Sequence, residues 1–302
     1  MGGLFLLAAL GGVLSSVQGP TNTALAKTTG RAFATFFSFC SGSLVLFILI
    51  QCLGSGDLTL VTTADPWQVT GGFFGFIVIV STIFATPRLG VALTTMSLMV
   101  GKIVSGVAID LLGLFGLHQR TLTLELAMGI ILLLVGITLI SIDRKRANPQ
   151  TNQTRSVSQI ILPVILMFIA GCGNSIQAPV NASLSQVVGT LEATLVSFLG
   201  GLMCASVFLL ISQLRACQSV SIQKPWTCLG GLYGVCICIV TIVVTPALGT
   251  TSLVSLQMLG QMTGGLIIDT FGFLDCMKLR ITVMRALGIA LIAIGSLFVA
   301  YL

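Results

Sequence analysis

Four amide side chains occupy matching places in two apolar segments of this 302-residue chain. Gln18 and Asn22 lie in the first segment, and Gln177 and Asn181 follow at the same spacing, 159 positions later. A proline stands between the two amides of each pair, and residues four apart share one face of a helix. Each segment therefore predicts a helix with a polar stripe, which is extended by one turn at Ser15 and at Asn174.

Such a stripe has a chemistry suited to small polar solutes. Hydrocarbon penalises polar side chains unless they face protein or water, and an amide both donates and accepts hydrogen bonds. We expect the two stripes to line a path and to bind a neutral or zwitterionic substrate. The alternative is that the same side chains only bridge neighbouring helices, as polar residues do in membrane bundles.

Lys102 is the only basic residue that we place deep inside an apolar segment. Its position in the second half of the chain is taken by Gln261, so this charge departs from the repeated pattern. The lysine could balance an anionic substrate group or accept a proton. The structural alternatives are an ammonium that reaches the membrane surface or one that is neutralised by Asp110.

Two aspartates stand in a second pair of matching motifs, G-x4-G-x3-D-x2-G, at Asp110 and Asp269. If the second copy is inverted, the two carboxylates lie at opposite ends of the path. Each is then a candidate gate or coupling-ion site. Alternatively, each aspartate only ends its helix beside a glycine-rich turn, where water hydrates it.

The composition indicates an integral membrane protein. Hydrophobic residues are 55% of the chain and charged residues 7%, whereas soluble proteins carry about a quarter charged residues, and the mean hydropathy is +1.09. No basic cluster with interleaved aromatics indicates a nucleic-acid partner. The single His118 and the nine cysteines show no metal-ligand spacing, so we expect no metal, no cofactor and no structural disulfide.

An enzyme is not indicated by the sequence. It contains no HExxH, GxSxG or Walker motif. The Gly54-Ser55-Gly56-Asp57 stretch is like the GxGD of intramembrane aspartyl proteases, but it lies in a polar loop and has no suitable partner aspartate within a span. We therefore predict no catalytic residue.

The elements that carry these residues are ten apolar segments, each near the roughly 20 residues that a membrane span needs. The two halves align at a constant offset of 159 without a gap. We predict an all-α membrane protein with a five-span repeat at 1–145, a linker at 146–158 and a second five-span repeat at 159–302. The predicted spans are 4–26, 33–53, 69–86, 88–112, 124–142, 160–184, 191–213, 228–245, 247–272 and 282–301.

The basic residues predict the orientation. An odd number of spans per repeat inverts the second copy, and positive loop residues favour the cytoplasm. Loops on one side hold twelve of the fourteen Lys and Arg, and the opposite side holds only Arg120. This predicts that both termini lie outside and that the linker 143–158 is cytoplasmic. The twelve are Lys27, Arg31, Arg88, Arg144, Lys145, Arg146, Arg155, Arg215, Lys224, Lys278, Arg280 and Arg285.

The motifs also resemble a known family. A five-span unit that opens with GxxxSxQGPxN and continues with PW, TPxLG and GxxxxGxxxDxxG is similar to the YdcZ-like branch of the drug/metabolite transporter superfamily. The resemblance covers essentially the whole chain. It implies an inner-membrane transporter whose path forms between two such units, and it supplies no substrate.

Taken together, these patterns favour a secondary transporter with a midplane site between inverted repeats. Its expected partners are a small solute and the lipid bilayer, with protons as a candidate coupling ion and a monomer or homodimer as the assembly. One alternative is a multidrug or cation efflux transporter, which would favour aromatic residues and a carboxylate in mid-span. The other is a non-transporting membrane scaffold, which would not need paired polar stripes.

Overall fold

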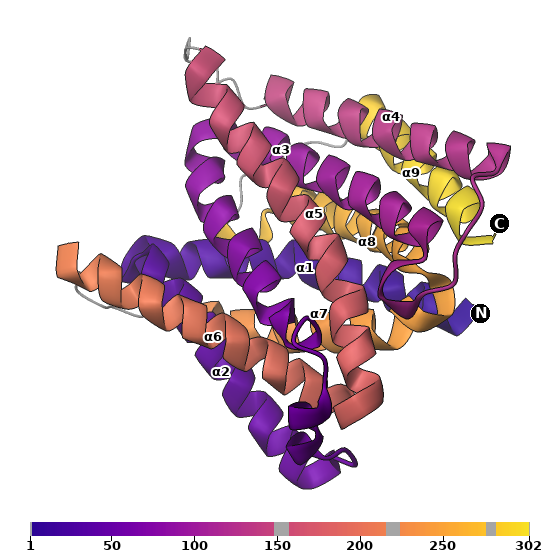
Figure 1. Cartoon of the computed structure of the whole chain (residues 1–302). Coiled ribbons are helices and arrows are strands. Elements are labelled where there is room, and N and C mark those ends of the chain that lie inside the picture. The colour runs from indigo at the N-terminus through magenta and orange to yellow at the C-terminus, as the bar shows by residue number, and fades with distance from the viewer. Residues whose placement is uncertain (1, 148–156, 216–223, 276–281, 302) are drawn as a thin grey trace.

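The computed structural model describes residues 2–147, 157–215, 224–275 and 282–301, and every regular element in these ranges is helical (Figure 1). The long helices are α1 (Gly2–Thr29), α2 (Arg31–Leu53), α3 (Gly71–Leu112), α4 (Leu124–Ala147), α5 (Val157–Val188), α6 (Thr190–Arg215), α7 (Gly230–Leu248), α8 (Thr250–Phe271) and α9 (Val283–Tyr301). Short 3-10 helices connect them at η1 (Leu58–Thr63), η2 (Gln68–Thr70), η3 (Leu114–Gly116), η5 (Pro225–Leu229) and η6 (Phe273–Asp275).

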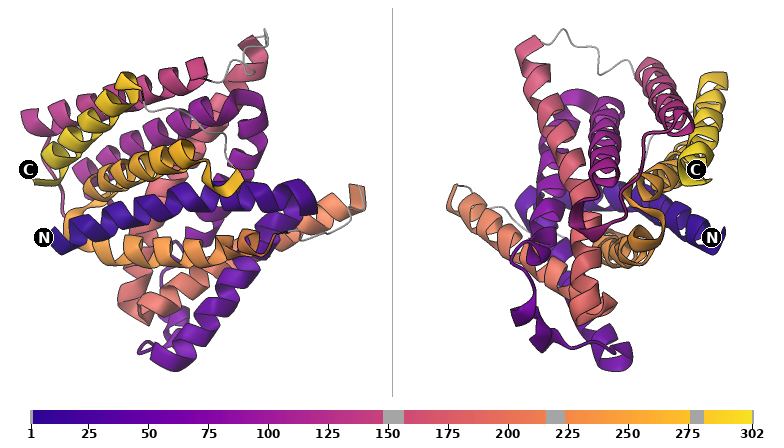
Figure 2. Two further views of the ribbon diagram at one scale, coloured as in Figure 1. Left: turned by 180° about the vertical axis from the view of Figure 1, so that it is seen from behind. Right: turned by 45° about the vertical axis from the view of Figure 1, so that its right-hand side comes forward.

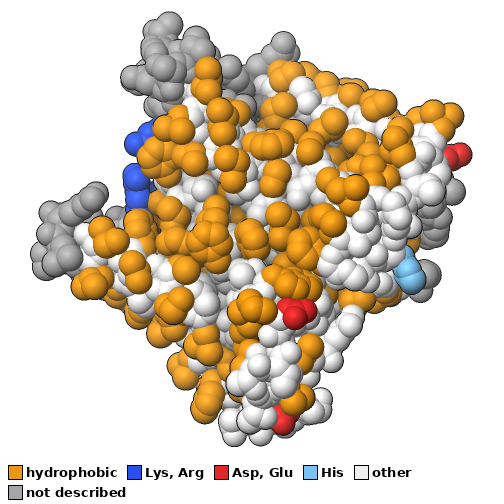
Figure 3. All heavy atoms as spheres, viewed as in Figure 1, with side chains coloured by type: hydrophobic (Ala, Val, Ile, Leu, Met, Phe, Trp, Pro, Cys, Tyr) orange, Lys and Arg blue, Asp and Glu red, His pale blue; other side chains and the backbone are white. Residues whose placement is uncertain are grey.

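Eight helical segments in the described ranges are long and apolar enough to cross a membrane. Apolar side chains cover most of the face shown in Figure 3, as expected for a surface that contacts lipid. The apolar part of α4, Leu124–Ile140, is shorter, and α8 is not among the eight. An all-α membrane protein is confirmed, whereas the number of ten spans remains a prediction. The eight are Gly2–Thr29, Arg31–Leu53, Gln68–Ala85, Thr94–Leu112, Ile160–Val188, Thr190–Ser212, Pro225–Leu248 and Val283–Ala300.

The helix α3 differs from the sequence prediction, which separated spans 69–86 and 88–112. The structure has one helix of 42 residues across both, and at 1.5 Å per residue a straight helix of that length would be about twice as long as a bilayer is thick. Figure 1 shows that α3 instead changes direction sharply, so that its two halves run side by side with α5. The two candidate spans within it, Gln68–Ala85 and Thr94–Leu112, flank this bend.

The matching part of the second repeat is broken into two helices. Helix α7 ends at Leu248, Gly249 has a φ of 78°, and α8 begins at Thr250. A positive φ is readily adopted by glycine and seldom by other residues. Two stretches with nearly the same sequence, TPRLG and TPALG, thus give a continuous helix in one repeat and a helix break in the other.

The helices pair across the two repeats. Helix α3 packs along α5, α1 packs against α7 and α8, α2 packs against α6, and α4 packs against α9. The last two pairs lie at opposite edges of the molecule in both Figure 1 and Figure 2. The main apolar clusters likewise draw side chains from both repeats, so the two halves share one interior.

Equivalent helices that meet at an edge run antiparallel. In α2 and α6, the ring of Phe198 lies against Gly42, and the ring of Phe39 lies against Gly201. The two phenylalanine rings, which are 159 positions apart, meet edge to face with their centroids 5.7 Å apart. The same reciprocal pattern joins α4 to α9, where Gly129 faces Gly295 and Gly136 faces Gly288.

Candidate functional site

The amide stripe of each repeat rests on glycines of the other repeat. In α1, Gln18 Nε2 donates a hydrogen bond of 3.2 Å to the carbonyl of Gly230 in α7. The Oδ1 atom of Asn22 lies against the same glycine and leaves no room for a Cβ there. In α5, the matching contacts place Asn181 against Gly71 and Gln177 against Gly75, both in α3. The two stripes therefore lie at the contact between the repeats.

The two asparagines differ in burial although their motifs match. Asn181 is 1% exposed, and its Nδ2 donates to Ser197 Oγ at 3.2 Å and to Cys238 Sγ at 3.4 Å. These bonds join α5 to α6 and α7, as the helix-bridging interpretation expects. Asn22 is half-buried, and its Oδ1 has no hydrogen-bond partner among the residues that the structure describes, as is also true of Asn181 Oδ1.

The remaining stripe residues are more open to a ligand. Gln18, Gln177 and Asn174 are half-buried, and the side chains of Gln177 and Asn174 form no hydrogen bond with the part of the chain that the structure describes. Both amides thus keep their donors and acceptors available. Ser15 instead donates to the carbonyl of Gly11 at 2.9 Å, within its own helix.

Lys102 lies at the contact between the second half of α3 and α5. Lys102 is 7% exposed, and its backbone carbonyl accepts a 2.7 Å hydrogen bond from Ser175 Oγ. Within the described ranges its ammonium forms no ion pair. Asp110 follows two turns later in the helix, about 12 Å along its axis, and uses its carboxylate elsewhere.

The Asp110 carboxylate caps a helix of the other repeat. This residue is 2% exposed, and its two oxygens accept hydrogen bonds from the backbone N–H groups of Thr250 and Thr251 at 2.9 and 2.8 Å. These are the first N–H groups of α8, which a carboxylate stabilises by hydrogen bonding and by the helix dipole. The matching Asp269 lies in α8, but its side chain is outside the described part of the structure.

The same twofold pattern is found by comparison with known proteins. The model of the family DMT_YdcZ, described as "Putative inner membrane exporter, YdcZ", matches the chain twice, at residues 3–139 and 162–298. The chain belongs to this family. It therefore combines two copies of the DMT_YdcZ unit, and membership identifies it as an inner-membrane transport protein.

A solved structure titled "Crystal structure of protein" has the same fold. It is 15% identical in sequence, with a TM-score of 0.69 over 96% of this chain and 95% of that chain. At that identity the likeness concerns the fold alone. A search among curated proteins found no match.

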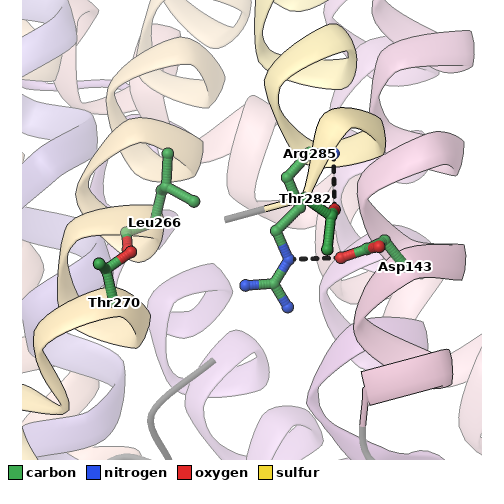
Figure 4. A network of polar contacts seen from close by, with 5 residues as sticks. All are labelled: Asp143, Leu266, Thr270, Thr282 and Arg285. Atoms are coloured by element: carbon green, nitrogen blue, oxygen red, sulfur yellow. Dashed lines mark hydrogen bonds and ion pairs between the residues drawn. The ribbon is translucent and has the colours of Figure 1, made fainter. Parts of the chain in front are cut away.

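Two buried charged features of this DMT_YdcZ protein were not singled out in the sequence. Asp143 in α4 and Arg285 in α9 form an ion pair in which Nε and Oδ2 are 2.6 Å apart, as Figure 4 shows. Both lie near helix ends, where charged residues were assigned to loops, so only the folded arrangement brings them together.

The second feature is Glu192 in the first turn of α6. This residue is 2% exposed, and its Oε1 accepts a 3.1 Å hydrogen bond from the backbone N–H of Gly56. The sequence did offer one signal, because a glutamate stands at the start of a predicted span, two residues after a glycine-threonine pair. Its partner is 136 positions away, and no local pattern indicates it.

Proposed function

We propose that this protein is a secondary-active transporter that moves a small polar solute across the inner membrane by alternating access between two inverted repeats. The observation that carries the proposal is that the amide stripe of each repeat rests on glycines of the other. A solute held by these amides contacts both repeats, so any movement of one repeat against the other changes the site. The antiparallel pairing of equivalent helices supports the inverted arrangement.

The side chains favour a solute that both donates and accepts hydrogen bonds. Gln18, Gln177 and Asn174 are half-buried amides, and Lys102, whose backbone carbonyl is bonded to Ser175 of α5, adds a positive charge when its buried amine is protonated. An amide with unused donors and acceptors binds a neutral or zwitterionic group, and the ammonium suits a carboxylate or phosphate on the same solute. We keep Asn22, Asn181 and Ser15 as supporting residues that position the stripes.

The alternative of multidrug or cation efflux is less well supported. A lipophilic cation needs a carboxylate or an aromatic cage at its site, whereas the motif helices α1 and α5 carry no Asp or Glu. Protons remain our candidate coupling ion, with Lys102, Asp110 and Asp269 as the groups that would carry them. Uptake that follows the substrate gradient alone, without response to a pH gradient or membrane potential, would contradict this coupling.

A thermal-shift screen of the purified protein tests the proposal without a prior choice of substrate. The screen covers metabolites, amines, organic acids and cationic drugs, because a ligand at 100 times its Kd stabilises the folded state by roughly 2.7 kcal/mol. We expect a polar hit whose stabilisation is lost in Gln18→Ala/Gln177→Ala. Loss in Lys102→Ala as well would identify an anionic group on the ligand.

A matched control is Gln51→Ala, which removes an exposed glutamine at the end of α2. This variant should keep the full shift. Hits that persist in the double variant, or no hits at all, would favour the interpretation that the stripes only join helices, as in a scaffold protein.

A further inference from the structure

The segment between α2 and α3, residues 54–70, which we call the strap, is tied to the second repeat. The backbone N–H of Gly56 donates to Glu192 Oε1 at 3.1 Å, and the backbone N–H of Asp57 donates to the carbonyl of Val188 at 3.0 Å. Both acceptors lie where α5 ends and α6 begins. The Gly54–Asp57 stretch, which has the GxGD pattern, is therefore the first part of this contact.

The other end of the strap has its own attachment. Gln68 is 7% exposed, and its Nε2 donates to Ser183 Oγ in α5 at 2.8 Å. The ring centroids of Trp67 and Phe115 are 5.5 Å apart, and Phe115 lies in η3, in the segment that connects α3 to α4. The strap thus spans the end of α5, which is the helix that carries Gln177 and Asn181.

Glu192 is enclosed by backbone at the first of these attachments. A Cβ at Gly56 or at Gly189 would overlap its carboxylate, so glycines form the walls around it. The carboxylate also lies in the first turn of α6, where the helix dipole favours negative charge. An ionised carboxylate that accepts an N–H forms a stronger hydrogen bond than a neutral acceptor.

Glu192 is not part of the repeated packing pattern. Its position in the first repeat is occupied by Phe33. A carboxylate that is costly to bury in a membrane protein is thus present at this position of the second repeat and absent from the matching position of the first. This asymmetry indicates a role that the packing of the helices does not require.

We propose that Glu192 is the latch that holds the strap closed over one end of the transport path, and that protonation of Glu192 releases it. The inference rests on the proposed function for the existence of the path. The ionised form accepts the N–H of Gly56, so the strap is closed at high pH. Lowering the pH adds a proton, which removes the charge and weakens the hydrogen bond from the Gly56 N–H, so the strap opens as the pH falls.

Few other titratable groups lie on the elements packed around Glu192. The strap carries Asp57 and Asp65, both exposed, and the end of α2 carries Cys52, also exposed. The segments 183–188 of α5 and 193–200 of α6 carry none. A hydrogen bond from the Thr59 hydroxyl, followed by one from the Thr59 N–H, lowers the pKa of Asp57. Asp57 therefore stays ionised to lower pH than an unpaired aspartate.

Hydrogen exchange at the amides of Gly56 and Asp57 measures the latch directly, because opening of the strap exposes both N–H groups. The purified full-length protein is followed by mass spectrometry of the 54–63 peptide, with intrinsic exchange corrected at each pH. We expect protection in the unmodified protein to fall as the pH is lowered, because protonation of the carboxylate weakens its bond to the Gly56 N–H. In Glu192→Gln, protection should be about tenfold lower at neutral pH and independent of pH.

Asp57→Asn is the matched control, since it removes a carboxylate of the same strap whose hydrogen bonds go only to Thr59. It should keep the pH response. Gly56→Ala opens the strap by a different route, because the added Cβ overlaps the Val188 carbonyl and the Glu192 carboxylate. In that variant the strap amides should exchange fast at every pH. It replaces Glu192→Gln as the test of the open strap if Glu192→Gln does not fold.

Equal protection in the unmodified protein and Glu192→Gln at all pH values would overturn the latch. So would a pH response that disappears in Asp57→Asn. Neither result depends on a substrate, so failure of the latch is distinguishable from failure of the transport proposal, which the thermal-shift screen tests.

Discussion

At the scale of single residues, several buried polar groups join the two repeats. Asp110 in the first repeat caps α8 in the second. Ser105 Oγ donates to the carbonyl of Cys172 at 3.2 Å, so α3 and α5 are joined by side chains as well as by close backbone contact. Such bonds are costly to leave unmade in a membrane interior. They explain why polar residues remain in an otherwise apolar chain.

The Asp143–Arg285 pair gives a test at this scale. Asp143→Leu leaves the Arg285 charge buried in a site where that residue is 2% exposed, and removal of one partner of a buried pair costs about 3–5 kcal/mol. We expect a clear drop in Tm. The double variant Asp143→Leu/Arg285→Met should recover most of the loss, because two apolar side chains replace the pair.

The control for these two variants is Asp65→Asn, which changes an exposed aspartate of the strap and should alter the free energy of unfolding by less than about 0.5 kcal/mol. Thermal unfolding of all four proteins in the same detergent provides the measurement. An Asp143→Leu variant as stable as the control would show that the pair contributes nothing to the α4–α9 contact.

At the scale of helices, glycine decides how closely the repeats approach. A Cβ at Gly72 of α3 would overlap the carbonyl of Ser197 in α6. A Cβ at Gly231 of α7, the matching position, would overlap the carbonyl of Ser38 in α2. Small residues allow such backbone contact between membrane helices. The glycine pattern of each repeat is thus explained by the other repeat.

Alanine substitutions at two glycines of this contact distinguish the effect of close packing on stability from the effect of helix propensity. Gly72→Ala should destabilise the protein by about 1–3 kcal/mol through overpacking. Gly200→Ala lies in the same contact, but its nearest neighbour to a new Cβ is Gly72 Cα at 3.7 Å. Because alanine favours a helix over glycine by roughly 1 kcal/mol, this second variant should be neutral or more stable.

The Tm of each variant, measured beside the unmodified protein, tests the prediction. Equal effects of both substitutions would mean that backbone propensity, and not the close approach of α3 to α6, controls the stability of this contact.

At the scale of the whole molecule, the charges visible on one face are unevenly distributed. In Figure 3 the visible Lys and Arg side chains gather at one edge, while the Asp, Glu and His side chains lie toward the right and the bottom of the view. This separation is what the positive-inside rule expects of a protein with one cytoplasmic side. It supports our proposal that the basic edge is cytoplasmic and that the strap lies outside.

Thiol labelling tests this orientation. Cys52 is exposed at the end of α2, next to the strap, and Lys224→Cys places a thiol at an exposed position before η5. In intact cells we expect a membrane-impermeant maleimide to label Cys52. It should label position 224 only after permeabilisation. Peptide mapping identifies the labelled sites, and the reverse pattern would invert the proposed topology.

The amino-acid sequence by itself determined the class of fold and its twofold construction. Apolar segments and a motif that returns after 159 positions are properties of the order of residues, so they are visible without any contact. The polar stripes were predictable for the same reason, since Gln18 and Asn22 share a helix face by their spacing alone.

Only the tertiary structure decided how these residues are used. Two nearly identical TPxLG stretches give a continuous helix and a broken one, and at the broken one Asp110 caps the new helix from 140 positions away. Asn181 is buried where Asn22 is not, and Glu192 meets the Gly56 N–H across the two repeats. Such pairings depend on which helices pack together, and burial is a property of that packing rather than of local sequence.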